Sequence, residues 1–75
     1  MNKIFYDNVA HNYAVIETIM MRPYYGAKKR TSYRLTQMDN ERTIYHVSCH
    51  ESYEDAKAKM ETQGLDWTEM KGESK

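Results

Sequence analysis

The supply of large apolar side chains limits what this chain can fold into. Only ten of its 75 residues are Ile, Leu, Val or Phe, a share below the roughly 20% at which disorder becomes a concern. Disorder also requires a high net charge, whereas eleven Lys and Arg here balance eleven Asp and Glu. Seven tyrosines, six methionines and one tryptophan must therefore complete the core. We expect a domain with a thin core that buries further surface against a partner or a second copy.

The single cysteine, Cys49, excludes an intrachain disulfide and is typical of a protein in a reducing compartment. No apolar run approaches the roughly 18 residues of a membrane-spanning helix, and the first residues lack the apolar stretch of a signal peptide. We therefore expect a cytoplasmic protein that does not contact a membrane. Residues 1–70 are expected to form one small domain, and residues 71–75 a disordered tail.

The clearest predicted element is a helix over residues 53–63. Ser52 can cap its N-terminus, with Asp55 three residues later, as in a capping box. Gly64 supplies a stop, and Leu65 is then placed to fold back on the last turn as in a Schellman motif.

Two strands are predicted before this helix, over residues 31–38 and 43–49. Both segments alternate in polarity and are rich in β-branched and aromatic residues. The polar residues 39–42 between them have the length and composition of a hairpin turn.

The first third of the chain is ambiguous. Apolar side chains recur at helical spacing from residue 4 to residue 21, yet residues 13–21 are rich in β-branched residues. We favour a strand over residues 13–21, with a further short strand or arm over residues 4–6. A last short strand over residues 65–70 would anchor Trp67 on the core.

These elements predict an α+β fold. A three-stranded antiparallel sheet carries one C-terminal helix packed on one face, in the order β-β-β-α, with extra short strands at the termini.

No pattern of residues indicates catalysis, a metal or a cofactor. His46, Cys49 and His50 do not match a zinc-ligand spacing, and neighbouring residues on a strand point to opposite faces, which separates the thiol from the imidazole of His50. We interpret Cys49 as a small buried side chain and both histidines as exposed residues at a strand end. The three glycines are isolated, which excludes a glycine-rich phosphate loop. We expect a protein that is not an enzyme and has no catalytic residue, metal or cofactor.

The strongest local signal is the basic segment 22–34. It holds five of the eleven basic residues, three tyrosines and no acid, and Pro23 and Gly26 indicate a turn at a hairpin tip. Its candidate contacts with a partner or with nucleic acid are Arg22, Tyr24, Tyr25, Lys28, Lys29, Arg30 and Arg34. Such cations can contact phosphates while the tyrosines stack on unpaired bases. The alternative is a solvated loop whose tyrosines pack on the edge of the sheet.

A second candidate surface follows from strand alternation, because one helix can cover only one face of the sheet. With Tyr33, Leu35, Tyr45 and Val47 placed under the helix, an apolar patch is predicted on the other face. Its residues would be Ile16, Met20, Met38 and Ile44. A symmetric homodimer would cover such a patch, as would the N-terminal arm and Trp67.

The composition favours a non-enzymatic protein that acts by stoichiometric protein–protein interaction. Inhibitors, adaptors and antitoxin-like regulators, of the kind that phages and mobile elements encode, share its small size and neutral charge. Tyr, Met and Arg are also the residue types enriched at interface centres. The alternative is a nucleic-acid-binding module that uses the basic hairpin 22–34, although the sequence pI near 6.8 counts against it.

Overall fold

The computed structural model describes residues 2–22 and 24–70, so the tail expected over residues 71–75 lies outside the described residues. Six elements follow one another along the chain: strands β1 (Asn2–Asp7), β2 (Tyr13–Met21), β3 (Arg30–Met38) and β4 (Ile44–His50), helix α1 (Tyr53–Glu61), and strand β5 (Trp67–Met70). The α+β class, with an antiparallel sheet and one helix, is confirmed.

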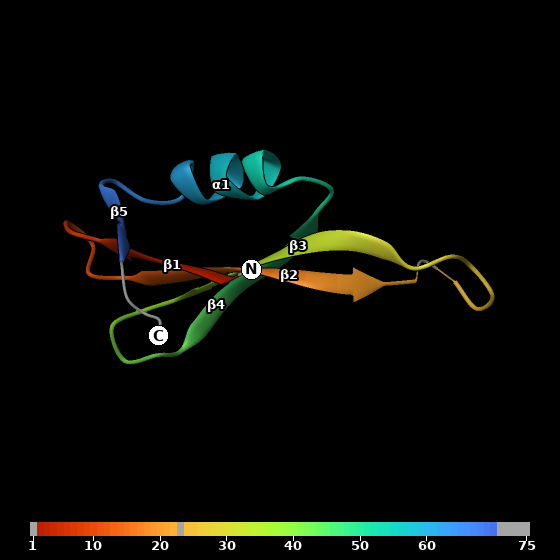
Figure 1. Ribbon diagram of the computed structural model, residues 1–75. Coiled ribbons are helices and arrows are strands. Elements are labelled where there is room, and N and C mark those ends of the chain that lie inside the picture. The colour runs from red at the N-terminus through yellow and green to blue at the C-terminus, as the bar shows by residue number, and fades with distance from the viewer. Residues whose placement is uncertain (1, 23, 71–75) are drawn as a thin grey trace.

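The sheet has five strands in the order β4-β3-β2-β1-β5, and every neighbouring pair is antiparallel. The three strands predicted for the sheet are β2, β3 and β4, and β1 and β5 extend the sheet beyond β2. Helix α1 lies along one face of the sheet and joins its two outer strands, β4 and β5 (Figure 1). We call the face under α1 the covered face and the opposite one the open face.

Residues 13–21 form a strand, as favoured from their β-branched composition. The strand pairs along its length with β3 and over its first half with β1. Ala14 and Ile16 are fully buried while Val15 between them is half-buried, which is the two-residue period of a strand.

The core lies between α1 and the covered face. Its buried apolar side chains are Phe5, Ala14, Ile16, Leu35, Ala56 and Met60. Three half-buried aromatic side chains pack against this cluster, namely Tyr33, Tyr53 and Trp67. The prediction that Trp67 anchors the last strand on the core is therefore confirmed.

The predicted apolar patch is only half correct. Ile16 pairs with Leu35 and is fully buried under α1, and Met20, four residues further along the strand, belongs to the same face. Met38 and Ile44 pair with each other, and alternation places them on the open face. Both faces of β2 are apolar, so alternation alone cannot choose between them. The tertiary structure places the face of Ala14 and Ile16 against α1, where both side chains are fully buried.

Strand β4 also presents the face opposite to the predicted one. Leu35 pairs with Ser48, and Thr36 with Val47, so Val47 lies on the open face instead of under the helix. An irregularity in the pairing next to the β3–β4 turn shifts the register there. A one-residue shift reverses the side of every following side chain, which explains the error.

The start of α1 is as predicted, but its end is not. The Ser52 hydroxyl accepts a hydrogen bond of 3.1 Å from the backbone N–H of Asp55. At the other end Leu65 is 75% exposed and does not fold back on the helix. Gly64 has a packing role: a Cβ there would collide with the indole of Trp67 and stand 2.7 Å from a carboxylate oxygen of Asp7.

The buried carboxylate of Asp7 joins two distant loops. Oδ1 accepts hydrogen bonds from the backbone N–H groups of Val9 (2.9 Å) and Ala10 (3.1 Å) in the β1–β2 turn. The N–H groups of Leu65 (2.8 Å, to Oδ2) and Asp66 (3.3 Å, to Oδ1) donate from the α1–β5 loop. No local pattern in the sequence predicts this role for Asp7, because two of its donors lie far away at residues 65 and 66.

These bonds predict a pH-dependent contribution to stability. Burial raises the pKa of Asp7, but four backbone N–H donors together outweigh burial and hold that pKa below the ordinary 3.8. The carboxylate therefore stabilises the fold above the unfolded-state pKa, and this stabilisation is lost as the pH falls through the folded-state pKa. We expect Asp7→Asn to lower the free energy of unfolding at neutral pH by about 2–3 kcal/mol, because one amide oxygen cannot serve four donors.

Urea titrations at neutral pH and below about pH 4 measure both effects, since the variant should lose less stability on acidification than the parent. The control is Asp66→Asn, an exposed carboxylate in the same loop, which should change stability by no more than about 0.5 kcal/mol. Equal losses in the two variants would contradict the role given to Asp7.

The side-chain amide of Gln37 is also buried but, unlike the carboxylate of Asp7, it is not hydrogen-bonded within the described residues. Gln37 is fully buried on the covered face, and both atoms of its amide lack a hydrogen-bond partner among the described residues. Replacing it with Met, which has a similar shape, removes the cost of burying that amide. We expect Gln37→Met to raise the free energy of unfolding by about 1–2 kcal/mol in urea titrations, and the exposed Gln63→Met to leave it unchanged. A loss of stability in Gln37→Met would mean that the amide is hydrogen-bonded through an internal water.

Candidate interaction surfaces

Strands β2 and β3 are longer than their neighbours and form a projecting arm. Pairing of β1 with β2 ends at Glu17, and pairing of β4 with β3 ends at Tyr33. Beyond these points β2 and β3 pair only with each other, as far as Met21 and Arg30. Figure 1 shows this end of the hairpin extending past α1 and the other strands. We call the described residues 19–22 and 24–32 the arm.

A tight turn at the arm's tip carries two exposed tyrosines. The N–H of Ala27 donates to the carbonyl of Tyr24 (3.1 Å), and Gly26 has a φ of +87°, which is typical of a type II turn with glycine at its third position. Tyr24 is 70% exposed and Tyr25 is 101% exposed. The alternative that the tyrosines of segment 22–34 pack on the sheet is therefore wrong for Tyr24 and Tyr25, whereas Tyr33 does pack against the core. Pro23 lies outside the described residues.

Four exposed cations flank these tyrosines in the sequence: Arg22, Lys28, Lys29 and Arg30. The ion pairs found in the described part of the chain are Lys3–Glu69 and Arg34–Glu17, so none involves these four. Arg34 does not belong to the tip. It is half-buried and its guanidinium donates two hydrogen bonds, of 2.9 and 3.1 Å, to one carboxylate oxygen of Glu17.

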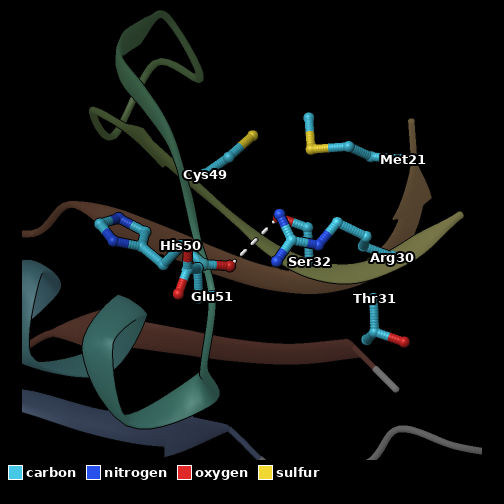
Figure 2. Close-up of a pocket in the computed structure, with 7 residues that line it drawn as sticks. All are labelled: Met21, Arg30, Thr31, Ser32, Cys49, His50 and Glu51. Atoms are coloured by element: carbon cyan, nitrogen blue, oxygen red, sulfur yellow. Dashed lines mark hydrogen bonds between the residues drawn. The ribbon is translucent and has the colours of Figure 1, made fainter. Parts of the chain in front are cut away.

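A hollow of about 360 Å³ lies at the base of the arm, and Figure 2 draws the side chains that line it. It is lined by Met21, Arg30, Thr31, Ser32, Cys49, His50 and Glu51. The Ser32 hydroxyl donates to the carbonyl of His50 (3.1 Å) and ties the arm to β4. In Figure 2 the thiol of Cys49 and the ring of His50 point in different directions, so the hollow does not bring these two groups together.

The interpretation of these residues from sequence needs correction. Cys49 is exposed and not a buried apolar side chain. His46 and His50 are half-buried, and the hydroxyl of Ser48 lies 3.0 Å from Nε2 of His46 and 2.7 Å from Nε2 of His50. Within residues 2–22 and 24–70, no three His, Cys, Asp or Glu side chains are grouped so that they could hold a metal ion.

The open face is apolar and partly exposed. By register it carries Ile4, Tyr6, Tyr13, Val15, Thr36, Met38, Val47 and Met70. Ile4 is 43% exposed, Met70 48% and Val47 53%. A shallow hollow of about 250 Å³ on this face is lined by Ile4, Tyr13, Val15, Met38, Arg42 and Met70.

The structure thus defines a small α+β protein with an apolar open face and a basic arm at one end. No protein-family model, no curated protein and no solved structure matches this chain. No helix within the described residues is long and apolar enough to cross a membrane.

The exposure of the arm predicts which tyrosines react first with a nitrating reagent that attacks the phenolate. Tyr25 should be modified fastest, followed by Tyr24, because solvent surrounds both rings. Tyr53 should react slowly, since it is half-buried and burial raises its pKa. Mass spectrometry of peptides over a time course measures these rates. If Tyr25 were modified no faster than Tyr53, the position given to the tip would be wrong.

Proposed function

We propose that this chain is a non-enzymatic binding protein that acts in fixed stoichiometry on another protein, as an inhibitor or an adaptor, through its open face. The apolar character of that face carries the proposal. Scattered exposed apolar residues are ordinary on a protein surface, but a contiguous apolar group on one sheet face is typical of an interaction site. Ile4, Val15, Met38 and Met70 form such a group, because they line one hollow.

The size of this hollow favours a protein partner over a small ligand. Its volume of about 250 Å³ is below the roughly 300–1,000 Å³ of typical small-molecule sites. The hollow is lined by apolar side chains together with Tyr13 and Arg42. This composition resembles the centre of a protein interface, where Tyr, Met and Arg are enriched. The side chains of a partner protein would fill it as anchors.

The thin core gives a second reason to expect a partner. Of the described residues, only six apolar side chains are buried, and α1 covers one face of the sheet. A domain of this size is only marginally stable on its own. Burial of the open face against a partner would add to its stability by mass action.

The test compares two valines of nearly equal exposure. Val47 is 53% exposed and lies on the open face, whereas Val9 is 56% exposed and lies in the β1–β2 turn. A photo-crosslinking amino acid is introduced at each position, and each variant is expressed in the organism of origin. We expect position 47 to crosslink to one protein in a one-to-one ratio, and position 9 to give no such crosslink. We expect Ile4→Lys on the same face to abolish this crosslink, because a charge would be buried at the interface, and Val9→Lys to leave it unchanged.

Light scattering at several concentrations completes the test. The purified chain should have the mass of a monomer throughout. A dimer that Ile4→Lys dissociates would assign the open face to a second copy of this chain and overturn the proposal. Crosslinking that is equal from positions 9 and 47, or that survives Ile4→Lys, would overturn it as well.

A further inference from the structure

The arm carries a separate inference, independent of the open face. We propose that it is a second binding site, and that its ligand is single-stranded nucleic acid. The cations of the tip contact phosphates, while Tyr24 and Tyr25 stack on unpaired bases.

The charges of the arm are free to act on an outside ligand. Arg22, Lys28, Lys29 and Arg30 are exposed and form none of the ion pairs found among the described residues. The chain holds no Asp or Glu between residues 17 and 39, and the carboxylate of Glu17 is occupied by Arg34. A chain of zero net charge therefore presents a local positive potential at one end, and local potentials are what steer charged ligands.

The side chains of Tyr24 and Tyr25 bury little of their surface within the chain. Tyr25 is 101% exposed, so its ring buries no surface within the chain. The turn that holds it requires the positive φ of Gly26, and open space surrounds that glycine. The local backbone therefore presents an aromatic ring to solvent. An exposed aromatic ring beside phosphate-binding cations is the arrangement that non-specific single-strand binders use.

The apolar surface of the arm favours a single strand over a duplex or an acidic protein. Met20 is 61% exposed and Met21 40% exposed, next to the cations of the tip. A duplex keeps its bases stacked on one another and offers mainly phosphates to such a surface. An acidic peptide would use the cations and leave the tyrosine rings without a partner. Only an unpaired strand supplies flat bases and phosphates together.

Salt dependence tests the role of the cations. Fluorescence anisotropy with a labelled single strand of about 12 nucleotides covers the usual site sizes. Four phosphate contacts predict a slope of log affinity against log salt near −2.8, since each contact on a single strand contributes about 0.7. The double variant Lys28→Gln/Lys29→Gln should weaken binding and bring the slope to about −1.4. The matched control, Lys57→Gln/Lys59→Gln, changes the net charge equally on the exposed side of α1 and should leave the slope unchanged.

Tyrosine substitution tests stacking. Tyr25→Ala should weaken binding of the strand about tenfold at an unchanged salt slope, because stacking involves no counterion release. The fold should tolerate this change, since the ring is fully exposed. Tyr45→Ala is the control, because Tyr45 lies in β4, away from the arm, and is also exposed. It should leave the affinity unchanged.

Three results would overturn this inference. The first is no measurable binding of the single strand at low salt. The second is equal or tighter binding of a duplex of the same length. The third is equally tight binding of an acidic peptide together with no effect of Tyr25→Ala, which would assign the arm to an acidic protein. Ile4→Lys should leave nucleic-acid binding intact, so the failure of either proposal is distinguishable from failure of the other.

Discussion

The fold depends on a carboxylate that is buried between two loops far apart in the sequence. Asp7 accepts backbone hydrogen bonds from the β1–β2 turn and from the loop that follows α1. These bonds hold β5 beside β1, where Trp67 pairs with Asp7 itself. Gly64 completes the arrangement, because only a residue without a side chain fits between the indole and the carboxylate. The loop that follows α1 is thereby attached to the β1–β5 edge of the sheet, opposite to β4.

A single helix of nine residues, spanning Tyr53–Glu61, can cover only one face of a five-stranded sheet. The covered face carries the buried apolar side chains of the sheet, and Ala56 and Met60 of α1 pack on it. Other apolar residues, such as Ile4, Val47 and Met70, lie on the open face, where water still reaches them. The exposed apolar surface that we propose as an interface is therefore a consequence of how few helical residues the chain supplies to cover its sheet.

The arm has a different physical origin. It exists because β2 and β3 extend beyond the ends of β1 and β4, so the hairpin continues as a two-stranded ribbon. Beyond Ser32, which is buried at its base, the rest of the sheet does not cover this ribbon, and side chains such as Tyr25 and Lys28 stay exposed. The ion pair of Arg34 and Glu17 lies where the ribbon joins the sheet. It lies between the basic tip and the apolar hollow of the open face, so the two surfaces that we propose as binding sites are distinct.

Local patterns by themselves predicted the strand at residues 31–38 and the start of the helix at Ser52, and they favoured a strand over a helix at residues 13–21. Each depends on interactions between residues close in sequence, such as the hydrogen bond from Asp55 to its cap. The exposed basic tip was also predictable, because charge and turn residues cluster in one segment. Tertiary structure alone decided that Ile16 is buried and Val47 exposed, since both faces of the strands are apolar and the pairing register makes the choice. It also decided the role of Asp7, because its donors at residues 65 and 66 come close only when the chain folds.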